Sequence, residues 1–270
     1  MTYIPYQEIP KALGIQKGDC VYLASNIMPF AFYAAKNGEK LDMNLFLDAF
    51  MEAVTEEGTL LIPTFHFDFS NKGVYDYKKT PCFTGALGNA ALSRTDFKRT
   101  LHPMHSFAVW GKDTKLLTSM KNLNSFGDDS PFAYMQETNV LQVMLGADYK
   151  EAMTFVHFVE RRADVPYRFF KKFTGEYTDE SGETSTRTYE YPARYLEMGS
   201  SEQFNRIGAI LEEKGIAKKI SINDVPVILT RLGDCYDTIY SDAKENKARN
   251  LYDFTCDRDE IWEKYHGCNS

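Results

Sequence analysis

Two residues near the middle of the chain have the types and spacing of an acid–base pair. His157 and Glu160 lie three residues apart in a segment with helical spacing, residues 152–162, which follows the apolar run VLQVMLG. Positions i and i+3 share a helix face, so the carboxylate can orient the imidazole ring and raise its pKa by stabilising the imidazolium. We therefore expect His157 to be a general base and Glu160 its partner. An ordinary surface ion pair is the alternative, because this spacing is common by chance.

A second group of polar side chains surrounds a proline. His102, Pro103, His105 and Ser106 occur within five residues of one another. The rigid ring of Pro103 holds two imidazoles and a hydroxyl close together, where they can line a polar pocket and donate to a carbonyl or a phosphate. The same short pattern is typical of a loop whose histidines cap backbone groups, so both interpretations stay open.

Two further segments offer candidate binding residues. Ser130-Pro131 predicts a helix N-terminus, whose free backbone amides can bind an anion or simply form a capped turn. The aromatic-rich segment 65–84 has little periodicity, and a long irregular loop in a compact domain is often functional. Its rings can stack on a sugar, so we expect Asp68 and Tyr75, together with His105, to contact a substrate. Ordinary loop packing is the alternative.

Strands and helices in alternation must position these groups. The first strand, helix and second strand fall within about fifty residues and predict a βαβ unit. The run 140–146 is the best candidate for a central strand, and 173–190 alternates as a β-hairpin with an exposed turn. Residues 26–40 look irregular. The other predicted strands are 20–25, 60–63, 107–111 and 225–232, and the predicted helices are 41–54, 85–93, 116–120, 152–162, 201–214 and 235–244.

Composition excludes several classes of protein. The formal charge of −7 disfavours a nucleic-acid partner. The five cysteines include no CxxC pair and the chain has no H-E-x-x-H motif, so we expect no disulfide framework and no metal. No signal peptide and no membrane span is predicted, which favours a cytoplasmic protein. The oligomeric state stays open, and a homo-oligomer is compatible with the sequence.

Seven landmarks between residues 18 and 160 occur in a characteristic order. Together they resemble the aminoglycoside 3-N-acetyltransferase family, which has an antibiotic N-acetyltransferase fold. The landmarks are Gly18-Asp19 with Ser25, Glu57-Gly58-Thr59 with Pro63-Thr64-Phe65, Thr80-Pro81 with Gly85, Arg99 with His102-Pro103 and Ser106, Gly127 with Ser130-Pro131, Gly146, and Thr154 with His157 and Glu160. The chain departs from the family pattern at Ala24-Ser25-Asn26, and 26–40 resembles an insertion.

The resemblance implies a single N-acetyltransferase domain over 1–270, with a mixed central α/β sheet flanked by helices and a β-hairpin insertion. It also implies acetyl-CoA as co-substrate, His157 as the catalytic histidine and Glu160 as its acidic partner. The implied cleft residues are Ser25, His102, Pro103, Ser106 and Ser130.

The predicted function is acetyl transfer from acetyl-CoA to an amine of an aminoglycoside or amino sugar, an antibiotic-resistance type of activity. We expect direct attack on the thioester, with backbone N–H groups or Ser106 stabilising the oxyanion, and we do not expect Cys82 to act as a nucleophile. Three alternatives remain: an acceptor that is a nucleotide-linked amino sugar from surface-glycan synthesis, a hydrolase using the same pair, and a non-catalytic acyl-CoA- or amine-binding protein.

Overall fold

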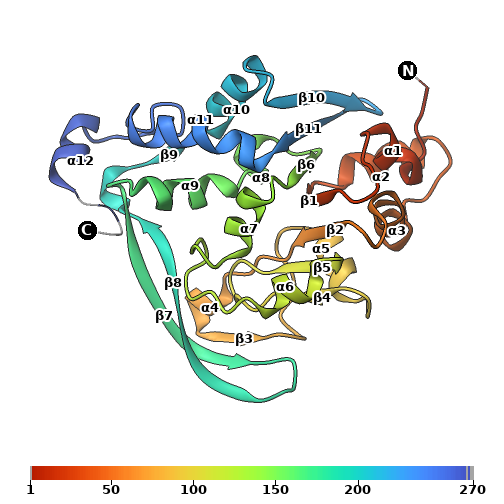
Figure 1. The fold of residues 1–270 in the computed structure, drawn as a ribbon, viewed down its shortest axis with the longest axis horizontal. Coiled ribbons are helices and arrows are strands. Elements are labelled where there is room, and N and C mark those ends of the chain that lie inside the picture. The colour runs from red at the N-terminus through yellow and green to blue at the C-terminus, as the bar shows by residue number, and fades with distance from the viewer. Residues whose placement is uncertain (1, 266, 268–270) are drawn as a thin grey trace.

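A seven-stranded mixed sheet forms the centre of the molecule (Figure 1). The computed structural model describes residues 2–265 and 267. The strands lie side by side in the order β10-β11-β6-β1-β2-β5-β4. Their bounds are β1 (Cys20–Ser25), β2 (Thr59–Pro63), β4 (Lys98–Arg99), β5 (Phe107–Gly111), β6 (Leu141–Leu145), β10 (Ala217–Ile222) and β11 (Val225–Arg231).

The three central strands β6, β1 and β2 are parallel, and the outer ones pair antiparallel. The chain leaves β1 through helices to β2 on one side, and β6 enters later on the other side. Crevices form where the carboxyl ends of parallel strands meet at such a switch in strand order. The βαβ unit and the central position of 140–146 are confirmed.

Helices cover both faces of the sheet. Successive side chains along each strand point to opposite faces, so both faces carry apolar residues that a helix can bury. Val21 and Leu23 of β1 pack with the helices of one face, and Tyr22 and Ala24 with those of the other. The first face holds α1 (Ile9–Ala12), α2 (Met28–Lys36), α3 (Met43–Val54) and α5 (Ala86–Leu92), with a 3₁₀ turn at Tyr6–Glu8. The second holds α6 (Thr114–Ser119), α7 (Pro131–Glu137), α8 (Tyr149–Ala152), α9 (Phe155–Ala163), α10 (Phe204–Glu213), α11 (Leu232–Lys244) and α12 (Arg258–Lys264). The predicted mixed sheet flanked by helices is confirmed.

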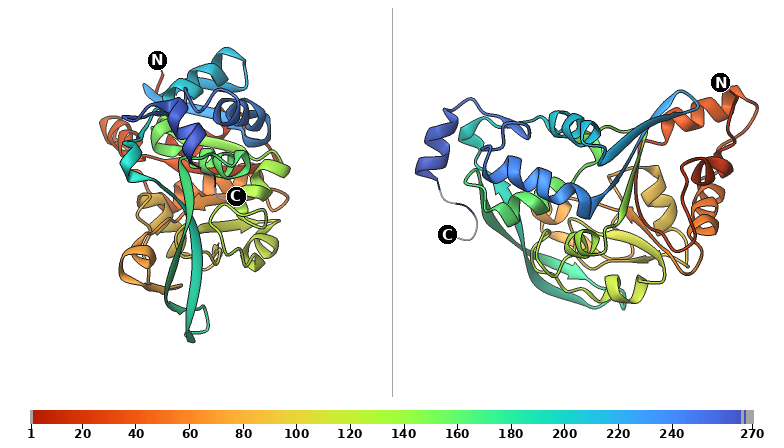
Figure 2. Two further views of the ribbon diagram at one scale, coloured as in Figure 1. Left: turned by 90° about the vertical axis from the view of Figure 1, so that its left-hand side faces the viewer. Right: turned by 45° about the horizontal axis from the view of Figure 1, so that its top comes forward.

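A long β-hairpin extends from the body of the molecule (Figures 1 and 2). Its arms are β7 (Arg168–Thr178) and β8 (Thr184–Arg194), and β3 (Val74–Asp76) pairs with β7 in parallel. A small separate cluster of buried aromatic side chains, including Tyr75, lies under this three-stranded sheet. The hairpin predicted over 173–190 is confirmed, and it is longer at both ends.

Several predicted boundaries were wrong. Residues 26–40, expected to be irregular, contain α2, where Phe30 and Ala34 are one turn apart and buried. The segment 65–84 contains α4 (Asp68–Lys72) as well as β3. The predicted helix 152–162 is interrupted, so that α9 starts afresh after Thr154. Sequence patterns missed the short elements β9 (Ser201–Glu202), β12 (Tyr252–Asp253), β4, β10, α12 and a 3₁₀ turn at Leu196–Met198.

The backbone of β7 lies so close to the residue before β3 that we predict a loss of stability when Gly175 is substituted. A Cβ atom at Gly175 would collide with the backbone of Gly73. Gly175→Ala should therefore lower the free energy of unfolding by about 1–3 kcal/mol, the usual cost of overpacking. Urea denaturation measures the change. Thr186→Ala, at an exposed position of β8, is the control and should stay within about 0.5 kcal/mol of the unsubstituted protein. Equal effects of the two substitutions would contradict the close-approach argument.

Candidate active site

His157 lies on α9 between two aromatic rings. The ring centroids of Phe126 and Phe204 are each 5.7 Å from that of the imidazole. The side chain of His157 is 14% exposed, so it is mostly dry but reaches solvent. A histidine in this position can exchange a proton with a molecule at the surface while its other edge faces the protein interior.

Glu160 holds the inner edge of that ring. Its side chain has no exposed surface, and its Oε2 atom is 2.8 Å from Nδ1 of His157. The hydroxyl of Tyr167 donates to Oε1 at 2.9 Å, and Nε of Arg168 lies 2.7 Å from Oε2. Burial alone would raise the pKa of Glu160, but the positive charge of Arg168 and the bonds from His157 and Tyr167 lower it to about 2. The carboxylate is therefore ionised.

Arg168, at the start of β7, forms a buried cluster with His157 and Glu160. It is buried, its Nη1 donates to the carbonyl of Pro192 at 2.7 Å, and its Nη2 donates to the hydroxyl of Tyr252 at 2.8 Å. The same Nη2 lies 2.9 Å from Nδ1 of His157. Sequence reasoning missed Arg168 and Tyr252, since no local spacing connects them to Glu160.

The pKa of His157 is lowered from its ordinary value. Burial is the largest cause and the charge of Arg168 the second, and together they outweigh the opposite effects of Glu160 and Glu202. Glu160 raises the pKa of the ring, as the sequence predicted, but burial and Arg168, which the sequence did not reveal, outweigh it. The ring is consequently neutral at neutral pH, which is the form a general base requires.

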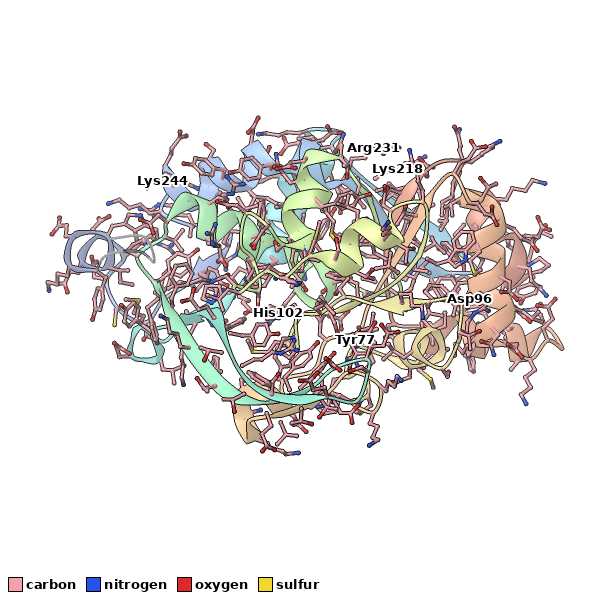
Figure 3. The ribbon with its side chains drawn as sticks, turned by 60° about the horizontal axis from the view of Figure 1, so that its bottom comes forward. Tyr77, Asp96, His102, Lys218, Arg231 and Lys244 are labelled. Atoms are coloured by element: carbon pink, nitrogen blue, oxygen red, sulfur yellow. The ribbon has the colours of Figure 1, made fainter. Side chains whose placement is uncertain are left out.

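His102 and His105 form a buried network in the loop before β5. Nδ1 of His102 accepts the backbone N–H groups of Met104 and His105 at 3.3 Å each, so this histidine caps its own loop. The hydroxyl of Ser125 lies 3.3 Å from Nε2 of His102 and 3.0 Å from Nδ1 of His105. The ring of His105 stacks on that of Tyr191 of the hairpin. Figure 3 shows His102 in the middle of the molecule, close to the hairpin.

Three further residues of the predicted cleft are buried, namely Pro103, Ser106 and Ser130, and the two serine hydroxyls hold loops in place. The Ser106 hydroxyl donates to the carbonyl of Thr64 at 3.0 Å and accepts from Nε of Arg99 at 3.0 Å. Ser130 is the N-cap of α7, where its hydroxyl accepts the backbone N–H three residues later. These arrangements indicate structural roles, and they give no support to Ser106 as an oxyanion donor.

Asp68 and Tyr75 occupy different surroundings. Asp68 is partly exposed on α4, and its carboxylate is 2.8 Å from Nζ of Lys72 and 3.2 Å from Nε2 of His66. Tyr75 is 1% exposed, and its ring lies 5.1 Å from the guanidinium of Arg99. A substrate at the surface can reach Asp68 but not Tyr75, so the structure disagrees with the sequence-based expectation for Tyr75.

A cleft of 430 Å³ lies at the carboxyl ends of β1, β2 and β6, and we call it the strand-end cleft. It is the crevice expected at the switch in strand order. Ser25 lines it, as does Thr154, which lies one turn before His157. Most of the lining is apolar, and it includes Ile27, Met28, Met43, Phe65, Phe83, Ala147 and Ala152.

A second cleft, of 600 Å³, lies along one face of the hairpin, and we call it the hairpin cleft. Arg168 lines it, so it also adjoins His157. Aromatic side chains dominate its wall, namely Phe67, Phe169, Phe173, Tyr191 and Tyr195. Its other charged residues are Lys171, Arg194 and Glu197. A larger cleft of 940 Å³ under the hairpin tip is lined by none of the residues that contact His157.

Residues 2–265 and 267 contain no group of three or more His, Cys, Asp or Glu side chains arranged to hold a metal ion. Over the same residues, no helix has the length and apolar character needed to cross a membrane.

The fold and the buried cluster define an α/β protein with a histidine–carboxylate pair beside two clefts. The family model described as aminoglycoside 3-N-acetyltransferase matches residues 35–241. This chain therefore belongs to the aminoglycoside 3-N-acetyltransferase family, as its motifs predicted.

Known proteins similar to the chain agree with that assignment. The SPbeta prophage-derived aminoglycoside N(3')-acetyltransferase-like protein YokD of Bacillus subtilis (strain 168) is 28% identical over 183 residues, which are 58% of this chain and 63% of that protein. The structure of AAC-IIIb in binary complex with CoASH has a TM-score of 0.75 at 19% identity, covering 89% of this chain and 95% of that one. Sisomicin-bound AAC-VIa has a TM-score of 0.76 at 18% identity, covering 91% and 99%. At these identities the structures show that the fold is shared.

The depressed pKa of His102 gives a prediction about stability. Burial lowers it to about 3, whereas an unfolded histidine has a pKa near 6.5. Between these values the unfolded chain binds one more proton, so stability falls as pH drops, by about 1.4 kcal/mol per pH unit.

In His102→Asn the side-chain oxygen replaces Nδ1 as acceptor, and the free energy of unfolding should depend less steeply on pH between 6 and 4 by that amount. Urea denaturation across this range, on the variant and the unsubstituted protein, is the measurement. Identical slopes would show that His102 does not titrate in this way.

Proposed function

We propose that this chain is an acetyl-CoA-dependent N-acetyltransferase that acts on an amine of an aminoglycoside or amino sugar. The observation that carries the proposal is the His157–Glu160 pair on a fold shared with the family, where the imidazole is neutral and Nδ1 lies 2.8 Å from the carboxylate. One N-acetyltransferase domain over 1–270 is part of the proposal, as is a cytoplasmic location. A homo-oligomer is compatible with it.

His157 is proposed to act as the base. The acceptor is mostly ammonium at neutral pH and has no lone pair for attack until it loses a proton. Nε2 of His157 takes that proton, and Nδ1–H donates to the ionised Glu160, which stabilises the imidazolium as it forms. The amine nitrogen then bonds to the thioester carbon and the carbon–sulfur bond breaks. The nitrogen loses its second proton as it becomes an amide, the leaving thiolate takes up one proton, and the imidazolium releases the other to solvent.

The strand-end cleft is the proposed site for the thioester end of acetyl-CoA. Its mostly apolar walls suit an extended acyl arm, and Ser25 and Thr154 place hydroxyl groups along it. Ser25 is the proposed donor to the thioester oxygen in place of Ser106, whose hydroxyl is engaged inside the protein, because Thr154 also bonds to the side chain of Tyr22. The complex of AAC-IIIb with CoASH supports acetyl-CoA as the donor.

The hairpin cleft is the proposed acceptor site, because its aromatic rings offer flat surfaces to a sugar. The likeness to sisomicin-bound AAC-VIa supports an aminoglycoside as the acceptor. One observation favours the second candidate, a nucleotide-linked amino sugar. Lys171 and Arg194 outnumber the single acidic wall residue Glu197, and a basic wall suits a phosphate better than a polycation.

The decisive experiment measures CoA release from acetyl-CoA against aminoglycosides, amino sugars and nucleotide-linked amino sugars. Release should require an amine, which separates transfer from thioester hydrolysis. His157→Ala should lower the rate by roughly 10²–10⁴-fold if the ring is the base. Circular dichroism would verify that the variant is folded. Near-normal turnover in a folded variant would refute the role of His157, and acetyl-CoA binding without product from any amine would favour the non-catalytic alternative.

A separate prediction concerns Glu160. In Glu160→Gln the negative charge that stabilises the imidazolium is lost, so the pKa of His157 should fall and the acidic limb of the pH–kcat/KM profile should move to lower pH. The rate should drop less than in His157→Ala, because the base remains. Steady-state kinetics between pH 5 and 8 provide the profile. An acidic limb at its original pH would indicate that Glu160 is only structural.

A further inference from the structure

We propose that Arg168 is a positioning residue of this active site, which fixes the Glu160 carboxylate against Nδ1 of His157 and keeps Nε2 of the ring available as the base. The inference rests on the proposed function and extends it to a residue outside the family motifs identified in the sequence.

The guanidinium of Arg168 contacts groups from three elements. Nε lies 2.7 Å from Oε2 of Glu160, Nη1 donates to the carbonyl of Pro192, and Nη2 donates to the hydroxyl of Tyr252. These partners come from α9, β8 and β12, so the fork cannot move without breaking contacts to three elements. A side chain that is 2% exposed and this constrained acts as a fixed support for the carboxylate.

Glu160 and Arg168 both face the same edge of the ring. Nδ1 of His157 is 2.8 Å from the carboxylate oxygen and 2.9 Å from Nη2. The ionised carboxylate can only accept, and a lone pair on Nδ1 would repel it at 2.8 Å, so we assign the proton to Nδ1, where it points to Glu160. Nε2 is then the unprotonated nitrogen, on the edge of the ring away from the cluster.

The charge of Arg168 acts together with its geometry. A guanidinium beside Nδ1 disfavours a second proton on the resting ring, in opposition to Glu160. Glu202 of β9 also favours protonation of the ring, and the nearby His105 is neutral because burial lowers its pKa. Arg168 is therefore the one positive charge among these neighbours that keeps the ring in its basic form.

Two substitutions separate charge from geometry. Arg168→Gln removes the charge, so the acidic limb of the pH–kcat/KM profile should move to higher pH, opposite to the shift in Glu160→Gln, and kcat should fall about tenfold to hundredfold. Arg168→Lys keeps the charge but loses the planar fork, so kcat should fall while the acidic limb stays near its original pH.

Arg94→Gln is the matched control. Like Arg168, Arg94 forms ion pairs, in its case with Asp48 and Asp96. It does not contact the His157–Glu160–Arg168 cluster. Its loss should lower stability without moving the acidic limb. A limb that stays in place in Arg168→Gln, or that moves equally in Arg94→Gln, would overturn the proposal.

Nuclear magnetic resonance of ¹⁵N-labelled histidine tests the inference without turnover. The His157 signals are assigned by their absence in His157→Gln. The unsubstituted protein should show Nδ1 protonated and Nε2 free, and the titration of the ring should move to higher pH in Arg168→Gln.

A protonated Nε2 in the resting protein would overturn the inference even if Arg168→Gln fails to fold. If the protein acetylates amines normally while Nε2 carries the proton, the role of Arg168 is refuted and the proposed function stands. The expected tautomer without any amine acetylation would refute the proposed function alone.

Discussion

The buried ion pair between Glu160 and Arg168 is the interaction on which the site depends. A carboxylate with no exposed surface is costly to bury unless its charge is matched, and removing one partner of such a pair costs about 3–5 kcal/mol. Because the partners come from α9 and β7, the pair also ties the base of the hairpin to the helix that carries His157. Tyr167 donates to Glu160 and Tyr252 accepts from Arg168, so that the hairpin, α9 and the C-terminal part of the chain meet at one ion pair.

That balance of charge also determines the state of the imidazole. Glu160 alone would favour a protonated ring, whereas burial and Arg168 favour a neutral one, and the second pair of effects prevails. A base must be unprotonated before the reaction and stabilised once it takes the proton. The cluster serves both needs, because the guanidinium acts on the resting ring and the carboxylate acts on the imidazolium.

The motif around Pro103 has a different part in the molecule. His102 accepts two backbone N–H groups, and Ser106 links Arg99 to Thr64, so these side chains shape a buried loop. The loop in turn supports Phe65, which lines the strand-end cleft and packs on His105. Residues that characterise the family motif can thus position the clefts through packing, at a distance from the reacting atoms.

The sequence by itself determined the parts of the protein that depend on neighbouring residues. Apolar runs and turn residues predicted the central strands and the hairpin, and the spacing of His157 and Glu160 placed them on one helix face. Only the tertiary structure decided the rest. Arg168 contacts Glu160 and His157 from the start of β7, Tyr252 of β12 bonds to Arg168, and the burial that lowers the pKa of His157 exists only after the layers close. Local periodicity carries no information about such contacts, because Arg168 lies outside the helix that carries Glu160 and Tyr252 is 84 residues further along the chain.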